Sequence, residues 1–413
     1  MTLRDLPLVA SLGDACCGCG TCAAKCPKAC IEMKADGCGF LRPEVDAAAC
    51  VGCGGCDSVC PAIGERPQDS IESVIWAKST NGGERLASSS GGMFALLAHD
   101  VLAAGGVVCG AAWEPVCRGV RHVLVEDEDG LDAVMRSKYV QSKIGRDVYE
   151  GMRAVLHDGR PVLFAGTACQ VAGVRAYLGK LADSDAFLAV DVICHGVPSP
   201  LLWEKWATWR ERRAGAPLRD VNMRSKTTGW LSYSAAYEYA AEKDGRAVCD
   251  GSVFGGDWYF KAFLSNASLR ASCLACPAKR SCGSDITLGD FWGVQAAHPE
   301  VDYAGGVSAV LCNTGRGVAA VDAVKPSLQW GESSLDKVLP GNPSLVRSVT
   351  PYEKRDRFMC DLGGGMGIDE LMAKYDFRPS LARRVHGKLG GVKRRLKKHL
   401  GRWSGLYGKG HLR

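Results

Sequence analysis

Two copies of one cysteine pattern stand within the first sixty residues of the chain. The first copy consists of Cys16, Cys19, Cys22 and Cys26, and the second of Cys50, Cys53, Cys56 and Cys60. In both copies two residues separate the first three cysteines, three residues precede the fourth, and a proline follows it directly. Because eleven of the 21 cysteines lie between Cys16 and Cys60, cysteine is concentrated here rather than spread along the chain.

Whether these thiols form disulfides or bind metal depends on the cellular compartment, which the sequence indicates. The number of cysteines is odd, and the first ten residues carry Arg4, Asp5 and Pro7 where a secretory signal would need an apolar core. A secreted chain held together by disulfides is therefore not expected. We expect a cytoplasmic protein whose thiolates act as metal ligands.

The spacing of the two copies is typical of bacterial ferredoxins that hold two [4Fe–4S] clusters. In that pattern three thiolates of one loop surround a cluster, and the fourth cysteine of the same copy ligates the other cluster. Cluster one would then use Cys16, Cys19, Cys22 and Cys60, and cluster two would use Cys50, Cys53, Cys56 and Cys26. A cysteine-rich zinc module is the alternative, but zinc needs four ligands per site and no such exchange of the fourth cysteine.

After a connector rich in proline and polar residues, strand and helix patterns alternate along the chain. Short apolar runs predict strands, and apolar residues at helical spacing predict helices between them. The predicted strands are 73–77, 107–112, 120–125, 161–165 and 187–192, and the predicted helices are 93–104, 131–135, 147–157 and 171–178. This order favours an α/β fold with a mixed sheet, with α+β as the alternative.

A stretch of 23 residues, from Gly91 to Trp113, is long enough to span a bilayer. His99 and Asp100 stand in its middle, and Gly105-Gly106 interrupts it. A central ionisable residue is costly in a membrane. The stretch is therefore interpreted as a helix, a glycine turn and a buried strand.

Four more cysteines form a set that no short motif contains. Cys169 and Cys194 each follow a predicted strand, while Cys273 and Cys276 form a Cys-x2-Cys pair in a predicted loop. If that loop folds over the edge of the sheet, the four thiolates could hold a third [4Fe–4S] cluster. A structural zinc site built from Cys273, Cys276 and Cys282 is the alternative.

Two segments of the central part could contact a cofactor. Serine hydroxyls and glycine amides directly precede the helix predicted at Met93, which can form an anion site, although a plain helix cap explains them equally well. Lys138 and Tyr139 offer a cation and an aromatic ring of the kind that a flavin needs.

Six motifs occur in an order that resembles the beta subunit family of coenzyme F420 hydrogenases and dehydrogenases, which includes 7-hydroxymethyl chlorophyll a reductase. They are Ser-Ser-Gly-Gly at 89–92, Ser-Lys-Tyr-Val-Gln-Ser at 137–142, Gly-Thr-Ala-Cys-Gln at 166–170, Ile-Cys-His-Gly-Val-Pro-Ser-Pro at 193–200, Cys-x2-Cys at 273–276 and Ser-Asp-Ile-Thr-Leu-Gly-Asp-Phe-Trp-Gly at 284–293. The similarity covers roughly residues 74–345. Ala168 replaces the proline that is commoner at its position in the family.

The resemblance implies FAD beside an iron–sulfur cluster in the central part. The cluster ligands that it implies are Cys169, Cys194, Cys273 and Cys276. The implied FAD residues are Ser89, Ser90, Gly91, Gly92, Lys138, Tyr139, Ser142, Gly289 and Asp290. His195 is a candidate proton donor beside the flavin, because its charge can change near neutral pH; a histidine that only orients the turn at Cys194 is the alternative.

These inferences predict an iron–sulfur flavoprotein oxidoreductase. It would pass electrons between a two-electron carrier at FAD, either coenzyme F420 or an organic substrate, and [4Fe–4S] clusters that serve a redox partner protein or reduced ferredoxin. The alternatives are an electron-transfer subunit without catalysis, a ferredoxin-dependent reductase of an unrelated substrate, and a zinc-rich structural protein. The predicted divisions are a ferredoxin domain at 13–66, a linker at 67–73, the FAD and iron–sulfur domain at 74–345, a C-terminal extension at 346–382 and a basic tail at 383–413.

The net positive charge of the chain comes from the basic tail. It holds eleven Lys and Arg residues and no acidic residue, and the remaining 40 basic and 45 acidic residues make the body mildly acidic. Leu389, Val392, Leu396 and Leu400 have helical spacing, which suits an amphipathic helix on an anionic membrane surface. A solvated or partner-docking helix is the alternative, because four glycines weaken helicity. Nucleic-acid binding is not expected.

Overall fold

The structure is a computed structural model that describes residues 6–64, 66, 68–243 and 246–377. The predicted basic tail at 383–413 lies outside these residues. The described residues up to Met372 form one compact unit. Within the described ranges, no helix has both the length and the apolar character that a membrane crossing requires. The stretch from Gly91 to Trp113 forms a helix, a turn and a strand, as predicted.

The N-terminal part is small and its interior consists largely of thiols. It contains one short helix and a two-stranded antiparallel hairpin: α1 (Thr21–Lys25), β1 (Ile31–Ala35) and β2 (Leu41–Val45). Five of the seven buried residues in its core are cysteines, namely Cys22, Cys26, Cys30, Cys56 and Cys60. Val9 and Ile31 are the other two. An interior with so few apolar side chains has little hydrophobic burial to stabilise it.

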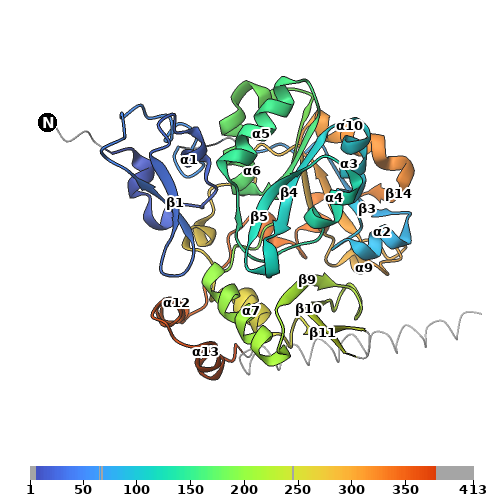
Figure 1. The fold of residues 1–413 in the computed structure, drawn as a ribbon. Helices are drawn as coiled ribbons and strands as arrows, with labels where there is room; N and C mark the ends of the chain where they lie inside the picture. Colours follow the sequence, from blue (N-terminus) through green and yellow to red (C-terminus); the bar gives the residue numbers. More distant parts are fainter. Residues whose placement is uncertain (1–5, 65, 67, 244–245, 378–413) are drawn as a thin grey trace, which may run out of the picture. The chain divides into compact units, whose positions relative to one another are not determined.

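The central part is built on a nine-stranded mixed sheet (Figure 1). Its strands lie in the order β14-β3-β13-β12-β8-β7-β4-β5-β6. Strands β12, β8, β7 and β4 run parallel to one another, and β13, β3 and β14 pair antiparallel with their neighbours. Strand β5 is antiparallel to β4 and parallel to β6. The strands are β3 (Ser73–Ser79), β4 (Val107–Trp113), β5 (Val120–Val125), β6 (Ser142–Lys143), β7 (Val162–Thr167), β8 (Phe187–Val192), β12 (Ile286–Asp290), β13 (Ser308–Cys312) and β14 (Leu328–Glu332).

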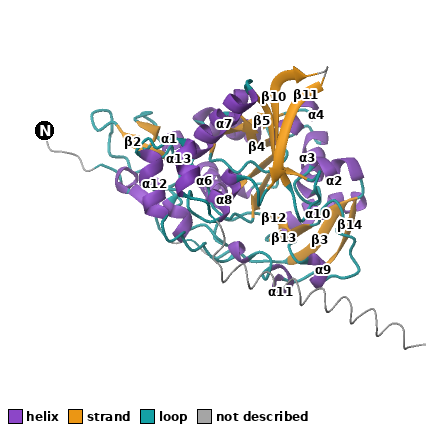
Figure 2. Cartoon of the chain, turned by 90° about the horizontal axis from the view of Figure 1, so that it is seen from below, coloured by secondary structure: helices purple, strands orange, loops and turns teal. Residues whose placement is uncertain are grey.

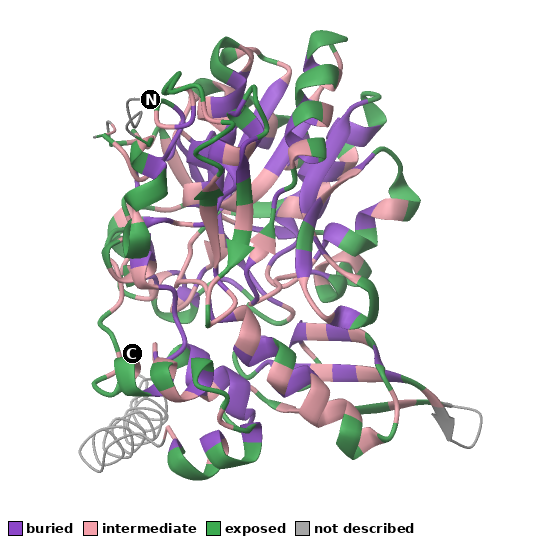
Figure 3. Cartoon of the chain, turned by 60° about the vertical axis from the view of Figure 1, so that its left-hand side comes forward, coloured by how far each residue is buried: buried purple, intermediate pink, exposed green. Residues whose placement is uncertain are grey.

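Helices cover both faces of this sheet. Alternation along β7 sends Leu163 to one face and Val162 and Phe164 to the other, as a period of two requires. The Leu163 face packs against α3 (Met93–Ala103), α4 (Glu128–Val134) and α10 (Gly315–Val324). The opposite face packs against α5 (Arg146–His157) and α6 (Ala168–Leu178). Figure 1 shows these two groups of helices on separate sides, and Figure 3 shows the buried strands between them.

A second, three-stranded antiparallel sheet follows the central strands in the sequence. It consists of β9 (Leu218–Ser225), β10 (Ser234–Lys243) and β11 (Arg246–Val253) (Figure 2). The helices α7 (Pro200–Ala214) and α8 (Trp258–Leu264) precede and follow it. The remaining helices are α2 (Gly82–Ala87), α9 (Val294–Ala297), α11 (Leu335–Val338), α12 (Arg355–Gly363) and α13 (Ile368–Lys374).

The α/β class and the mixed sheet predicted from the sequence are confirmed. All five predicted strands and all four predicted helices are present, with bounds that differ by a few residues. The second sheet and the hairpin of the N-terminal part were not predicted. The domain boundaries stay predictions.

Candidate iron–sulfur and cofactor sites

The carboxyl ends of two neighbouring parallel strands place the first two cysteines of the central site. Thr167 at the end of β7 pairs with Val192 at the end of β8, so that the segments which follow leave the sheet at the same edge. Cys169 lies in the first turn of α6, which Thr167 and Gln170 cap reciprocally. Cys194 stands two residues beyond β8. Ligands commonly bind at this edge of an open α/β sheet.

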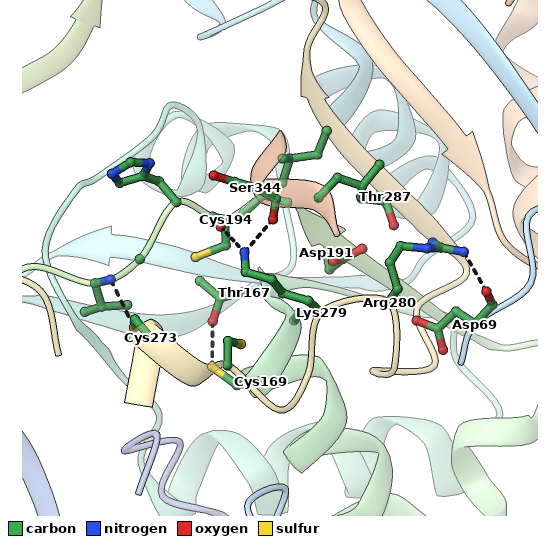
Figure 4. A pocket seen from close by; sticks show the side chains of 18 residues that line it. Asp69, Thr167, Cys169, Asp191, Cys194, Cys273, Lys279, Arg280, Thr287 and Ser344 are labelled. Atoms are coloured by element: carbon green, nitrogen blue, oxygen red, sulfur yellow. Dashed lines mark hydrogen bonds between the residues drawn. The ribbon is translucent and has the colours of Figure 1, made fainter. Parts of the chain in front are cut away.

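The Cys-x2-Cys pair reaches the same place from a distant loop. The Arg270 amide donates to the carbonyl of Val197, and the Val197 amide donates to Cys273 Sγ at 3.4 Å. The Cys276 amide donates to Ser348 Oγ at 2.9 Å. Cys169, Cys194, Cys273 and Cys276 thereby line one cavity of about 550 Å³, open solvent at its mouth included (Figure 4).

Cys282 is separated from that cavity by its own contacts. It is buried, and both its amide and its thiol donate to Asp69 Oδ2. It does not line the cavity that holds Cys273 and Cys276. The zinc site of Cys273, Cys276 and Cys282 therefore gains no support from the geometry.

Burial keeps most thiols of the central site protonated in the absence of a metal. It raises the pKa of Cys273 to about 12 and also raises the pKa of Cys194 and Cys276. Cys169 differs, because a hydrogen bond from Cys17 lowers the pKa of its thiol. Lys279 Nζ donates to the carbonyl of Cys194 at 2.8 Å and to the carbonyl of Ser344, and so adds a positive charge to the cavity wall (Figure 4). This positive charge favours the thiolate forms of Cys194 and Cys276, which are the forms that ligate metal.

The second cysteine set of the N-terminal part surrounds a cavity of its own. Cys26, Cys50, Cys53 and Cys56, the four ligands predicted for cluster two, all line a space of about 340 Å³. Cys53 is exposed to solvent. Cys30, which lies outside the repeated pattern, lines the same space, with its sulfur 3.3 Å from that of Cys26. Five thiols therefore face a site for which four were predicted.

The cysteines of the first set are more deeply buried than those of the second set. Cys16, Cys19, Cys22 and Cys60 are all buried, and burial and then the neighbouring thiols of this set raise the pKa of Cys22. The Gly18 amide donates to Cys16 Sγ at 3.3 Å, and Thr21 Oγ1 donates to Cys19 Sγ at 3.3 Å. Gly18 has a φ of 71°, and a Cβ there would lie 2.8 Å from the guanidinium of Arg270. The loop can approach the central part this closely only because residue 18 is glycine.

These sulfur arrangements differ from a site for one ion. Among the residues that the structure describes, no three His, Cys, Asp or Glu side chains are placed to hold a metal ion between them. A cubane cluster has another requirement, because each of its four thiolates ligates a different iron atom and the sulfurs stand apart around the cluster. All three predicted sets have the residue types for such clusters, and the central set and the second N-terminal set also line cavities.

Cys17 joins the first set to the central set. Its thiol is hydrogen-bonded to both Cys19 and Cys169, and these bonds, together with burial, raise its pKa well above the ordinary value. In the sequence Cys17 lies outside the repeated pattern, and it could replace a neighbouring ligand only if the loop were shifted. Its contact with Cys169, 152 positions along the chain, depends on tertiary structure that no local signal could indicate.

The predicted flavin residues meet around an arginine that sequence reasoning did not identify. Arg224 is buried at the end of β9, where its Nη2 donates to Asp290 Oδ1 at 2.8 Å and to the Ser89 carbonyl at 3.2 Å. Its Nη1 lies 3.5 Å from the hydroxyl of Tyr139. Trp230 Nε1 also donates to Asp290 Oδ1 at 2.7 Å. Three distant motifs of the sequence are thus brought together.

The Ser-Gly-Gly loop lies in basic surroundings with unsatisfied polar atoms. Lys226 Nζ donates to the carbonyls of Arg85 and Ser90 at 2.6 Å and of Gly305 at 2.7 Å. Four buried atoms around this loop have no hydrogen-bond partner among the described residues: Arg85 Nε, Arg224 Nε, Ser88 Oγ and the carboxylate oxygen Glu84 Oε1. Buried donors without partners are rare and indicate a missing ligand or water. Two arginines and a serine hydroxyl with free donors suit an anion such as a phosphate.

The other predicted flavin residues are held by the protein itself. Lys138 Nζ donates to the carbonyl of Met135 at 2.7 Å, and burial lowers the pKa of this lysine to about 7. Gly289 lies against Ile193, where a Cβ would come within 2.5 Å of that side chain. Gly91 and Gly92 lead into α3, and Ser90 Oγ donates to the carbonyl of Val307. None of the nine predicted flavin residues lines the 550 Å³ cavity.

Ser142 is engaged by a buried histidine. His122 Nε2 donates to the carbonyl of Ala165 at 3.1 Å, so its Nδ1 accepts from Ser142 Oγ at 2.7 Å. The ring also stacks on Phe164. Burial lowers the pKa of His122 to about 4.

This histidine predicts a loss of stability in acid. In the unfolded chain His122 is protonated below its ordinary pKa of 6.5. In the folded chain it stays neutral until the pH falls to about 4. The free energy of unfolding should therefore fall as the pH drops, by roughly 2 kcal/mol between pH 7 and pH 5. Urea unfolding at both values should show this loss in the wild type and not in His122→Gln. Equal losses in the two proteins would contradict the assignment.

His195 lines the central cavity and is fixed by a neighbour. Its Nε2 lies 2.6 Å from Asn266 Oδ1, and its ring meets the edge of Phe263. Burial lowers its pKa, so the ring is neutral near pH 7. Phe263 also contacts Tyr139, which leaves one aromatic side chain between His195 and the flavin set. These contacts fit the orienting role, and proton donation stays a prediction.

The chain was compared with known proteins. A family model described as the C terminus of the beta subunit of coenzyme F420 hydrogenase/dehydrogenase matches residues 159–337. No curated protein matches the chain. Among solved structures, a chain of the xenon-derivatized F420-reducing [NiFe] hydrogenase complex from Methanosarcina barkeri is similar with a TM-score of 0.42 and 16% identity, over 73% of this chain and 93% of that chain.

The family match covers the segments that supply much of the central site. It includes Cys169, Cys194, Cys273 and Cys276 as well as Arg224 and Asp290. Residues 159–337 of the chain are thus similar to the C-terminal part of the coenzyme F420 hydrogenase/dehydrogenase beta subunit family.

Proposed function

We propose that the chain is an iron–sulfur flavoprotein that exchanges electrons between a two-electron carrier and [4Fe–4S] clusters. The observation that carries this proposal is the convergence of four cysteines from three separate segments on one cavity, beside a two-copy ferredoxin pattern. The match of residues 159–337 to a family model of hydrogenase and dehydrogenase subunits agrees with an oxidoreductase role.

The residues present fit three clusters. Cys169, Cys194, Cys273 and Cys276 would hold the central one, and the two N-terminal sets would hold the others. Cys17 contacts a ligand of the central set and a ligand of the first set. Cys22 and Cys60 of the first set pack in one core with Cys26 and Cys56 of the second. This order would lead electrons from the central part to the exposed loop around Cys53, where a redox partner protein or ferredoxin could approach.

The surroundings of the Ser-Gly-Gly loop fit FAD. Arg85, Arg224 and Ser88, with their unpartnered buried atoms, would bind the phosphates, while Tyr139 and Asp290 would lie beside the ring system. When bound, FAD would accept two electrons from a carrier and release them singly to the clusters. We propose the deazaflavin coenzyme F420 or a small organic molecule as the carrier.

A second candidate is an electron-transfer subunit that has clusters but no flavin. The ion pair between Arg224 and Asp290 favours it, because these groups already satisfy each other. The absence of the nine predicted flavin residues from the lining of the central cavity favours it as well.

Anaerobic mixing with reduced coenzyme F420 distinguishes these functions. The first proposal expects the flavin absorbance to bleach before the cluster absorbance. If F420 has no effect but reduced ferredoxin bleaches the clusters and then the flavin, the chain is a ferredoxin-dependent reductase of another substrate. Bleaching of clusters alone, in a protein that contains no flavin, would support the second candidate and contradict the first.

A further inference from the structure

The Arg270 side chain is a buried cation that lacks a carboxylate partner. Only 1% of the residue is exposed. Its guanidinium donates to three neutral oxygens: the carbonyl of Cys16 at 2.7 Å, Gln141 Oε1 at 3.2 Å and the carbonyl of Leu41 at 2.8 Å. No Asp or Glu among the described residues forms an ion pair with it.

A charge in this position is costly unless something negative compensates it. Hydrogen bonds to neutral carbonyls satisfy its donors, but they do not neutralise a charge that has been removed from water. Of the two other buried arginines of the central part, Arg224 pairs with Asp290. Arg280 resembles Arg270, because it donates to Asn313 Oδ1 and to the carbonyls of Asp69 and Ser70, but it is less deeply buried, with 8% of the residue exposed. For Arg270 the compensating charge must come from groups other than carboxylates.

The groups that surround Arg270 are cysteine thiols from two of the predicted cluster sites. The guanidinium donates to the carbonyl of Cys16 in the first set. On the other side the Arg270 amide donates to the carbonyl of Val197, whose own amide donates to Cys273 Sγ in the central set. The charge of Arg270 interacts electrostatically with Cys16 and Cys19 of the first set and with Cys169 and Cys273 of the central set.

The backbone around Arg270 fixes it at this junction. Its side chain bonds the carbonyl of Cys16 in the first set, and its own carbonyl accepts from the Cys273 amide in the central set. The aromatic ring of Phe40 lies over the guanidinium, with its centroid 5.3 Å away. Gly18 leaves room for the guanidinium where any side chain would collide with it.

We propose that Arg270 is the shared counter-ion of cluster one and the central cluster, and that its charge sets the reduction potentials of both. This inference rests on the proposed function. One-electron reduction adds one negative charge to a cluster, supplied by the redox partner or the flavin. A fixed cation beside the cluster stabilises this reduced form, so it raises the potential. Because one guanidinium faces both sites, it raises two potentials together.

Arg270→Gln tests the inference through potentials rather than activity. An EPR-monitored redox titration of the full chain should resolve one-electron waves for three clusters. In Arg270→Gln two of these waves should move to lower potential, with a shift of at least tenfold in the equilibrium between oxidised and reduced forms, which is 59 mV for one electron. The third wave, from cluster two, should stay in place.

Further variants separate charge from structure. Gln141→Glu places a carboxylate against Arg270 and keeps the oxygen that accepts from it, so it should lower the same two potentials even if Arg270→Gln does not assemble its clusters. Arg270→Lys keeps the charge and should leave the potentials near the wild-type values. Arg210→Gln is the control, because the side chain of Arg210 is 10% exposed and lies among Tyr237, Asp250 and Asp257, not among cysteines.

Two results would overturn the inference. Unchanged potentials in Gln141→Glu, with the full iron content retained, would show that the charge of Arg270 does not act on the clusters. If Arg270→Lys and Arg270→Gln shifted the cluster potentials equally, the effect would come from the lost hydrogen bonds of the guanidinium and not from its charge. A failure of the proposed function would be seen separately, as a wild-type protein whose iron content does not account for three clusters.

Discussion

Cys169→Ala is expected to lose about four iron atoms per chain, the content of one cubane cluster. Cys169 stands in the first turn of α6. Among the described residues, only four cysteines line the central cavity, and Cys169 is one of them. Cys282 cannot replace it, because that thiol is directed to Asp69. Electron transfer between the flavin and the N-terminal clusters should be lost as well, since the central cluster connects them.

The control for this variant is Cys249→Ala, which removes an exposed cysteine from the second sheet. Its iron content should equal that of the wild type. Iron and acid-labile sulfide are measured on both variants after anaerobic purification. Full iron content in Cys169→Ala would show that the central cavity holds no four-cysteine cluster.

Removal of iron is expected to unfold the N-terminal part while the central part keeps its structure. Five of the seven buried residues in the N-terminal core are cysteines, so without clusters this part has few apolar contacts to hold it. The central sheet instead has large apolar cores on both faces. Limited proteolysis after chelation should therefore cleave residues 6–64 on the order of 100-fold faster than in the iron-loaded protein.

The central part serves as the internal control of this experiment. Its fragment should survive the digest with and without iron, because its stability comes from apolar burial. An N-terminal part that remains resistant after complete iron removal would contradict the account. It would mean that cysteines in this core pack as ordinary small apolar residues.

Local patterns predicted the central strands and helices because burial imposes a period on the sequence. The run from Val107 to Ala112 and the run from Phe187 to Val192 are apolar throughout most of their length, as strands covered on both faces must be. The cysteine sets could be assigned for a similar reason, since the spacing within one loop follows from the size of the cluster it encloses.

The residues that sequence reasoning missed act through contacts that are distant in the chain. Arg224 reaches Ser89 and Asp290 from a strand of the second sheet, which was not predicted. Arg270 contacts Cys16 across 254 positions. Neither arginine belongs to a motif, so only the fold could reveal that each is buried and which groups it faces.

The most direct test of the central claim is an analysis of iron, zinc and flavin in one sample of the anaerobically purified chain. The account predicts about twelve iron atoms and one FAD per chain, as three four-iron clusters and one flavin require. About eight iron atoms with one zinc and no flavin would contradict it, and would leave a two-cluster ferredoxin joined to a structural scaffold.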